Sequence, residues 1–378
     1  MKKEVAVFSD VELGAGNLTD DFISDVALSK TIVDLSRKKH DVDLVFNGDT
    51  MDFLKCPYMD QGHLTYPWHV TEEISLGKLD LVYQAHTKVF ETMKSFAKCK
   101  GKNIYFVIGN HDFDLVWPKM QKKLKEIIGY AKKVHFVFEY ENGGLYVEHG
   151  NQRDLFNGFD KNNLYLSFKG EKILNFPWSS FMVIHSFISL KEVYPFTNRF
   201  VPWSTVLSFS PDISKLIVMR VTRFIFRALF YTPIKKFIDP TLSFPRKIIS
   251  AFIARARSFK VEPDIVAIFR AREDLVDGKK LVILGHAHHE LLSIEEDKTI
   301  IQMGAWRDEY LLNRKTKSLT HQKKKYVSVM VHGEELDYTL VHVPIKRRSL
   351  KFNEVLGNEM KFLRRAAKEE GFVPRLVK

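Results

Sequence analysis

Short apolar runs alternate with longer amphipathic stretches over the first third of the chain. The regions 21–39 and 71–97 carry apolar residues at helical spacing, so each predicts a helical region. The runs between and after them are rich in β-branched and aromatic residues, which favours short buried strands. Alternation of this kind predicts an α/β fold. The predicted strands lie at 4–9, 43–47, 103–108, 134–138, 144–148, 280–284, 299–302 and 326–331.

The alternation stops between residues 151 and 277. This segment is rich in Phe, Ile, Arg and Lys and is interrupted by prolines, which indicates an inserted, largely helical subdomain. The chain then divides into a core of 1–150 and 278–343, the insertion at 151–277, and a basic C-terminal extension at 344–378. No internal repeat or low-complexity tract is evident in the sequence.

Composition narrows the class of protein. An apolar fraction of 45% and a charged fraction of 28% are typical of a globular chain, and two cysteines cannot form a disulfide framework. Asp10 interrupts the first apolar run before a signal-peptide core could form. No uncharged stretch reaches the roughly 20 residues that a membrane span needs. We therefore expect a soluble, cytoplasmic protein.

The net charge of +12 is concentrated in the insertion. Between Ile213 and Lys260 there are eleven Lys and Arg residues and one acid, Asp239. Arg220, Arg223 and Arg227 recur at spacings of three and four along a mostly apolar helix. Three interpretations stay open: a subdomain that packs on itself, contact with an anionic lipid surface, or contact with nucleic acid, which the abundant aliphatic residues disfavour. No protein partner is evident.

Polar residues follow five of the predicted strands. Asp, Asn, His and Glu are ligands of divalent metal ions, and glycines beside them let the backbone approach closely. Each group alone is a weak signal, whereas the ordered set is specific. The five groups are Asp10-Val11-Glu12, Gly48-Asp49-Thr50-Met51-Asp52, Gly109-Asn110-His111-Asp112, His149-Gly150 and Gly285-His286-Ala287-His288.

This set, in this order, resembles the calcineurin-like metallophosphoesterases, over about 1–150 and 280–343. Within the family, the SDVELG, GNHDF and MGAW segments look most like the UDP-2,3-diacylglucosamine hydrolase branch, which carries a helical lid where the insertion lies. The resemblance implies a four-layered α/β-β/α metallophosphoesterase sandwich with a helical insertion. It also implies an enzyme in which two divalent metal ions activate water to cleave a phosphoester or pyrophosphate bond.

The resemblance also implies a role for each matching residue. His111 would be the general acid or a cation beside the leaving oxygen, and Asp52 would orient its ring. Asp49 would bridge the two ions. One ion would be held by Asp10, Glu12, Asp49 and His288, and the other by Asp49, Asn110, His149 and His286.

Glu12 departs from the family pattern, which has His at that position. A carboxylate can still ligate a metal ion, but it favours harder ions and adds negative charge. Because no thiolate ligand is present either, we expect Mn or Fe in preference to Zn or Mg. Asp112 is interpreted as a cap of the following segment in preference to a metal ligand. Arg153 either binds substrate or pairs with Asp154.

The sequence thus predicts a dinuclear metal-dependent phosphohydrolase. The preferred substrate is amphipathic or lipid-linked, met at the inner membrane surface, with Arg153, Arg220, Arg223 and Arg227 as candidate substrate contacts. Two alternatives are a soluble nucleotide phosphodiesterase or nuclease, and a non-catalytic scaffold that has kept the fold. A scaffold is expected to lose metal ligands, and the nearly complete set here disfavours it.

Overall fold

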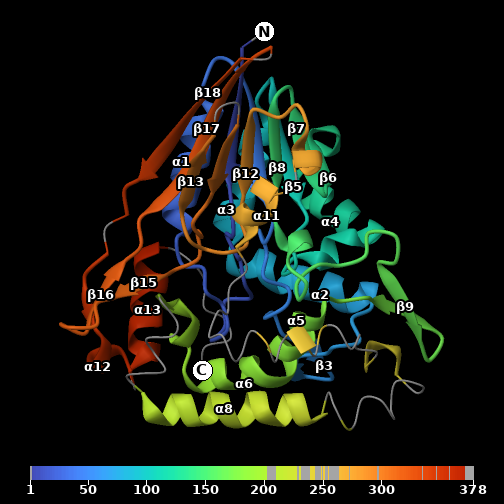
Figure 1. Ribbon diagram of the computed structural model, residues 1–378, viewed down its shortest axis with the longest axis vertical. Coiled ribbons are helices and arrows are strands. Elements are labelled where there is room, and N and C mark those ends of the chain that lie inside the picture. Colours follow the sequence, from blue (N-terminus) through green and yellow to red (C-terminus); the bar gives the residue numbers. More distant parts are fainter. Residues whose placement is uncertain are drawn as a thin grey trace.

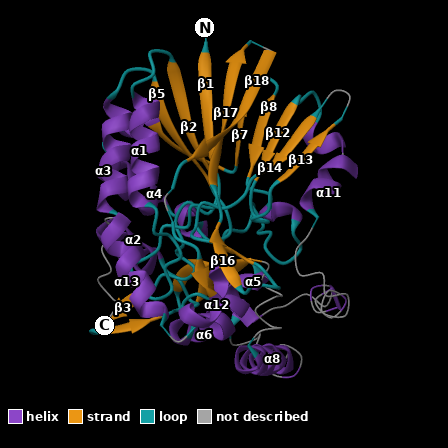
Figure 2. Ribbon diagram, turned by 90° about the vertical axis from the view of Figure 1, so that its left-hand side faces the viewer, coloured by secondary structure: helices purple, strands orange, loops and turns teal. Residues whose placement is uncertain are grey.

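The computed structural model describes residues 2–201, 210–227, 230, 239–242, 248, 250, 251, 254, 264–271, 273–295, 298–333, 335–345, 347–356 and 358–370. Two sheets form its centre (Figure 2). The larger has the strand order β18-β17-β1-β2-β5-β6, in which β1, β2, β5 and β6 are parallel and β17 and β18 antiparallel. Its strands are β1 (Lys3–Phe8), β2 (Asp41–Asn47), β5 (Lys102–Val107), β6 (Val134–Val137), β17 (Lys324–His332) and β18 (Glu335–Val343).

The second sheet has the order β13-β14-β12-β8-β7. Its three inner strands are parallel, and both edge strands run antiparallel to their neighbours. The strands are β7 (Glu139–Asn142), β8 (Leu145–Glu148), β12 (Leu281–Leu284), β13 (Leu291–Ile294) and β14 (Thr299–Gln302). All eight predicted strands are confirmed within one or two residues, but β7, β13 and β18 were not foreseen.

The two sheets face each other across an apolar core. Side chains alternate between the faces of a strand, so β1 sends Val5 and Val7 into this core and Ala6 and Phe8 to the opposite face. In β12, Ile283 lies in the core between the sheets and Val282 on the outer face. Such strands are buried on both faces, which explains why the sequence shows continuous apolar runs there.

Helices cover the outer face of each sheet. On the larger sheet lie α1 (Asp25–Ser36), α3 (Thr87–Lys98) and α4 (Pro118–Ile128), and α2 (Glu72–Ala85) packs beside them. On the smaller sheet lies α11 (Ile265–Ala271), with its apolar face against β8, β12 and β14. The layers are therefore helix, sheet, sheet, helix, and the predicted four-layered α/β sandwich is confirmed (Figure 2).

The helical region predicted at 71–97 is divided into α2 and α3 at His86. Both ring nitrogens of this buried histidine lie close to carboxylates, Nδ1 at 2.8 Å from Asp25 and Nε2 at 3.0 Å from Asp20. The backbone of His86 leaves helical geometry, with φ −117° and ψ 32°. Sequence periodicity missed this break because its cause lies some sixty residues earlier in the chain.

Besides α11, which covers the smaller sheet, the insertion contains a hairpin and several helices. They are β9 (Tyr165–Phe168), β10 (Glu171–Leu174), α5 (Trp178–Met182), α6 (Ile188–Val193), α8 (Pro211–Phe226) and a π-helix at Val183–Phe187. Figure 1 shows α8 along the end of the molecule opposite to the N-terminus. The insertion also carries four basic residues within 246–259, and this stretch falls outside the described residues except at 248, 250, 251 and 254.

A small sheet joins the insertion to both other segments. It contains β11 (Phe200–Val201), β15 (Tyr310–Leu312), β16 (Ser318–His321) and β19 (Leu350–Lys351), in the order β11-β15-β16-β19. The helices α12 (Phe352–Val355) and α13 (Glu359–Glu370) follow it. The remaining elements are the hairpin β3 (Tyr58–Asp60) and β4 (His63–Thr65), and 3-10 turns at Phe113–Val116, Ala131–Lys133, Asn151–Arg153, Thr197–Arg199, Pro240–Leu242 and Glu273–Val276.

Among the described residues, no helix is both long enough and apolar enough to cross a membrane.

Candidate metal centre

The carboxyl ends of β1, β2, β5, β8 and β12 meet at one edge of the two facing sheets. The loops that follow these strands carry the residues that the sequence singled out: Asp10, Glu12, Asp49, Asp52, Asn110, His111, His149, His286 and His288. The fold thereby places polar groups separated by almost 280 residues in one region, as expected for strand ends in an α/β sheet.

One group of potential ligand atoms consists of Asp49, His149 and His286, whose atoms lie within 4.8 Å of one another. His149 Nε2 lies 3.1 Å from Asp49 Oδ2. The other ring nitrogen, Nδ1, lies 2.9 Å from the backbone oxygen of Asn47 and so must carry the proton of a neutral ring. In that neutral form, Nε2 carries no proton and could bind a metal ion.

Asn110 offers a further oxygen ligand. Its Nδ2 donates to Asn157 over 3.5 Å, while the buried Oδ1 has no hydrogen-bond partner. A buried carbonyl oxygen without a partner is costly unless something else satisfies it. A divalent ion would satisfy it, and this supports the fit between the residues present and a metal ion.

A second group consists of Glu12, Asp52 and His111. It differs from the predicted set, because the resemblance grouped Glu12 with Asp10, Asp49 and His288. His288 lies close to two members of the predicted set: its Nε2 is 3.2 Å from Asp10 Oδ1 and 3.5 Å from Glu12 Oε1. The structure therefore brings the predicted ligands of this ion into one region as well.

Five of the candidate ligands have a left-handed backbone. Positive φ angles occur at Asp10 (51°), Glu12 (56°), Asp49 (48°), His286 (70°) and His288 (56°). This conformation is uncommon for residues other than Gly and costs about 1–3 kcal/mol at each position. Strain of this kind persists where the surrounding structure requires a particular side-chain direction, and it is concentrated at functional sites.

Two glycines allow the loops to approach closely. A Cβ atom at Gly109 would lie 2.2 Å from Asp49 Oδ1, and one at Gly285 would lie 2.0 Å from Ser9 Oγ and 2.7 Å from Asp10 Oδ2. Neither position tolerates a side chain. The close approach of neighbouring side chains therefore requires glycine at the positions directly before Asn110 and His286.

In this region, burial and neighbouring charges shift the pKa of each buried group in opposite directions. Burial alone would lower the pKa of His149, but Asp49 and Asp10 outweigh it and raise that pKa to about 10. For Asp49, burial acts to raise the pKa, yet His149 and His111 bring it below the ordinary value. Buried carboxylates need cations nearby, and for Asp49 these cations are the imidazoliums of His149 and His111.

His111 and Asp52 form the predicted catalytic pair. Nδ1 of His111 lies 2.9 Å from Asp52 Oδ1, and the His111 backbone N–H donates to Asp49 Oδ1 over 2.8 Å. Burial lowers the pKa of His111, but Asp52 and Asp49 outweigh this effect and raise it. The ring is therefore held in one orientation and favours its protonated form.

Sequence reasoning missed two cations beside Glu12. Lys55 Nζ lies 2.8 Å from Glu12 Oε2, and Arg307 NH1 lies 3.3 Å from Glu12 Oε1. Lys55 lies three residues after Asp52, outside the Gly48–Asp52 motif. Arg307 directly follows the MGAW segment, whose Trp306 donates its backbone N–H to the backbone oxygen of Asp10 over 2.9 Å. That segment could have directed attention to Arg307.

Asp112 lies at the N-cap position of the following 3-10 turn, as the sequence interpretation expected, but its side chain has another role. Its side chain makes no capping hydrogen bond to the following 3-10 turn. Instead, its two oxygens accept hydrogen bonds from the backbone N–H groups of Gly109 (2.7 Å) and Thr50 (2.8 Å). Asp112 therefore joins the loops after β2 and β5, a role that depends on two strands being neighbours.

The candidate substrate arginines lie in different surroundings. Arg153 pairs with Glu148 at 3.0 Å and packs on the ring of Phe269, while Asp154 lies 3.4 Å from His286 Nε2. Arg220 donates to the backbone oxygen of Ser186 and to Ser189 Oγ, so it faces the inner helices. Arg223 and Arg227 are exposed. Arg220, Arg223 and Arg227 therefore do not form one exposed stripe along α8.

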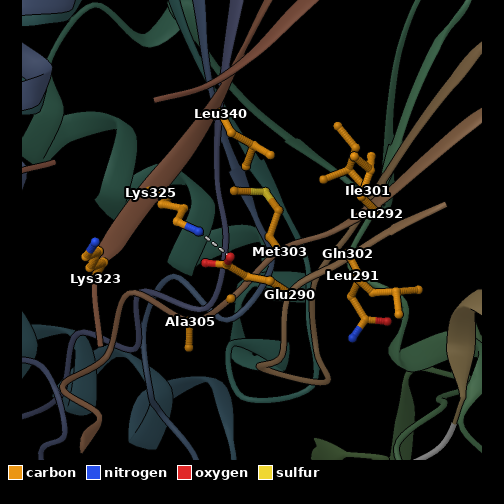
Figure 3. Close-up of a pocket in the computed structure, with 11 residues that line it drawn as sticks. Glu290, Leu291, Leu292, Ile301, Gln302, Met303, Ala305, Lys323, Lys325 and Leu340 are labelled. Carbon is orange, nitrogen blue, oxygen red and sulfur yellow. Dashed lines mark hydrogen bonds and ion pairs between the residues drawn. The ribbon is translucent and has the colours of Figure 1, made fainter. Parts of the chain in front are cut away.

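A separate pocket of about 240 Å³ lies between strands β13 and β14 of the smaller sheet and strands β17 and β18 of the larger sheet (Figure 3). Apolar side chains, including Leu292, Met303 and Leu340, form much of its lining, and an ion pair joins Glu290 to Lys325. None of its lining residues is a candidate metal ligand.

No protein-family model matches the chain, and no curated protein matches it. Solved structures that resemble it include a predicted phosphoesterase from Streptococcus pneumoniae, with 10% identity, a TM-score of 0.30, and coverage of 93% of this chain and 98% of the other. A dimetal phosphatase from Danio rerio has 9% identity, a TM-score of 0.36, and coverage of 92% and 98%.

A putative 5'-nucleotidase from Staphylococcus aureus has 13% identity, a TM-score of 0.34, and coverage of 98% of this chain and 58% of the other. At such low identities and TM-scores, conclusions about the function of this chain rest on its own side chains.

Proposed function

We propose that this protein is a metal-dependent phosphohydrolase of the calcineurin-like metallophosphoesterase type. The observation that carries the proposal is the meeting of five strand ends around buried carboxylates and histidines, five of which have a left-handed backbone. Carboxylate, imidazole and amide ligands in this combination suit divalent transition metals. Mn or Fe is the proposed metal.

The proposed ligand sets are those that the sequence resemblance implies. Asp49, Asn110, His149 and His286 would hold one ion, and Asp10, Glu12 and His288 would hold another that shares Asp49. The unpartnered Asn110 Oδ1 and the proton-bearing Nδ1 of His149 support this fit. When bound, such ions lower the pKa of water and neutralise charge on a phosphate group.

His111 is the proposed proton donor. Because Nδ1 lies against Asp52, the opposite nitrogen, Nε2, is left to give a proton to the leaving oxygen of the substrate. Asp52 keeps the ring oriented and supports its positive charge. With the charge of the phosphate neutralised, this pair is suited to cleaving a phosphoester or pyrophosphate bond.

The proposed substrate class is amphipathic, such as a nucleotide-linked lipid of the kind that the UDP-2,3-diacylglucosamine hydrolase branch cleaves. Support comes from the outer side of α8, where Val218 and Phe226 are each 63% exposed and Met219 is 56% exposed. The cationic residues Lys215 and Arg223 lie on the same helix and are exposed too. Exposed apolar side chains beside cations suit the surface of an anionic membrane.

The activity is tested on purified, Mn²⁺-loaded protein with a simple phosphodiester, a phosphomonoester, a nucleotide-linked lipid pyrophosphate and single-stranded DNA. The proposal expects hydrolysis that a chelator abolishes, and fastest turnover of the lipid-linked substrate. Preference for DNA or for a soluble nucleotide would support the nuclease or nucleotide phosphodiesterase alternative. Bound metal without turnover of any substrate would favour the scaffold.

Membrane contact is tested separately by co-sedimentation with vesicles containing anionic or only neutral lipids. The double variant Arg223→Glu and Arg227→Glu should reduce binding to anionic vesicles, since each basic group near such a surface contributes about 1 kcal/mol. The matched control is Lys119→Glu and Lys122→Glu, which makes the same change of charge on α4, where both lysines are exposed. Equal binding by the parent and both double variants would contradict membrane contact through α8.

A further inference from the structure

The two sides of the metal centre differ in fixed positive charge. Glu12, on one side, is fully buried and contacts both Lys55 and Arg307. Asp49, on the other, contacts the ring of His149 and the backbone N–H of His111. The Glu12 side therefore has two long cationic side chains in contact with its carboxylate, whereas the Asp49 side has an imidazole ring and a backbone donor.

Lys55 is held firmly in its place. Its side chain is 4% exposed, and its Nζ lies 2.7–2.8 Å from carboxylate oxygens of Glu12, Asp21 and Asp52. Three carboxylates around one ammonium group stabilise its charged form and fix its position. Its charge is therefore a permanent part of the Glu12 side.

Arg307 is held in a similar way but reaches nearer to solvent. Its Nε lies 2.7 Å from Glu309 Oε1, its NH1 contacts Glu12, and the side chain is 15% exposed. Glu309 also lies 3.2 Å from His288 Nδ1, so the guanidinium belongs to the same network as a candidate ligand. A dication beside Glu12 would have to share that carboxylate with two cations, at a separation where repulsion in a buried site is strong.

We propose that the centre binds divalent ions unequally: one tightly at Asp49, Asn110, His149 and His286, and a second weakly on the Glu12 side. Lys55 and Arg307 already pair with Glu12, and their charges oppose the second ion. This inference rests on the proposed function only in requiring that the centre binds divalent metal ions. It assigns to Arg307 the role of setting how many ions the protein retains.

The test titrates metal-free, full-length protein with MnCl₂. Equilibrium dialysis with elemental analysis gives the stoichiometry, and electron paramagnetic resonance distinguishes an isolated Mn²⁺ from a coupled pair. The first equivalent should bind at least about tenfold more tightly than the second, a difference of about 1.4 kcal/mol. Its spectrum should be that of an isolated ion. Two equivalents of equal affinity, with a coupled spectrum from the start, would overturn the inference.

Arg307→Met should bring the second affinity closer to the first by about tenfold, because it removes one of the two opposing charges. The matched control is Arg347→Met, which removes another largely buried guanidinium, one that pairs with Asp308. Arg347→Met should leave the ratio of the first to the second Mn²⁺ affinity unchanged. An equal change of this ratio in both variants would count against a specific role for Arg307. Thermal unfolding checks that each variant is folded.

His149→Ala provides a second, independent variant. It should remove the tight ion and leave the weak one, so that the first Mn²⁺ binds with the lower affinity of the parent protein. Loss of the weak ion with retention of the tight one would overturn the assignment. If neither the parent nor any variant binds Mn²⁺, the proposed function itself fails, an outcome distinct from equal binding at two sites.

Discussion

The Nδ1 atom of His111 lies 2.9 Å from Oδ1 of Asp52. The second oxygen of the same carboxylate lies 2.7 Å from the buried ammonium of Lys55. One oxygen of Asp52 is thus held by the Lys55 ammonium, and the other orients the His111 imidazole. A positioning residue of this kind should affect the protonation of the ring as well as the rate.

Asp52→Asn should therefore shift the pH dependence of turnover. The carboxylate raises the pKa of His111, and a proton donor is lost as the pH rises through its pKa. Removing the negative charge should move the alkaline limb of the kcat/KM profile to lower pH and reduce turnover by about 10–100-fold. An unchanged alkaline limb, in a variant that is folded and binds metal, would contradict this role of Asp52.

Asp49→Asn and His111→Asn should separate metal binding from proton transfer. Asp49 belongs to the group with His149 and His286, so loss of its charge should weaken metal binding and abolish activity. His111→Asn should retain the metal and lower turnover by about 10²–10⁴-fold. Elemental analysis and kinetics on both variants check this, and equal metal loss in the two would refute the division of roles.

Glu12→Gln should destabilise the metal-free protein. The neutral amide leaves Lys55 and Arg307 with one partner fewer in a buried site, which should lower the free energy of unfolding by about 1–3 kcal/mol. The control is Asp34→Asn, which removes an exposed pair with Arg37 and should cost less than about 1 kcal/mol. Urea unfolding measures both, and similar losses would show that the Glu12 contacts contribute no more than a surface pair.

His86 should make stability fall at alkaline pH. Burial alone would lower its pKa, but Asp25 and Asp20 outweigh it and raise the pKa to about 10, above the ordinary 6.5. A raised pKa in the folded state gives stability that is complete below pH 6.5 and is lost as the pH rises toward 10. The difference in unfolding free energy between the parent and His86→Gln should therefore shrink over that interval. A constant difference would contradict a charged His86.

The sequence by itself determined the alternation of strands and helices and the order of the polar strand ends. Both features are local: strand and helix periodicity depend on neighbouring residues, and each candidate ligand follows its own strand directly. Parallel strands then bring those ends together, so most of the candidate centre could be predicted without coordinates. The edge strands β7, β13 and β18 escaped because short or half-exposed strands have a weaker pattern.

Only the tertiary structure decided what surrounds Glu12. Its contact with Arg307 joins residues 295 positions apart, and Lys55 lies 43 positions away, after the Gly48–Asp52 motif and outside it. The same holds for the break at His86, for the two loops that Asp112 joins and for the inward direction of Arg220. Periodicity reports which face of an element is buried, but not which charged group from a distant segment will meet it there. Those contacts depend on how the sheets, the loops and the insertion pack against one another.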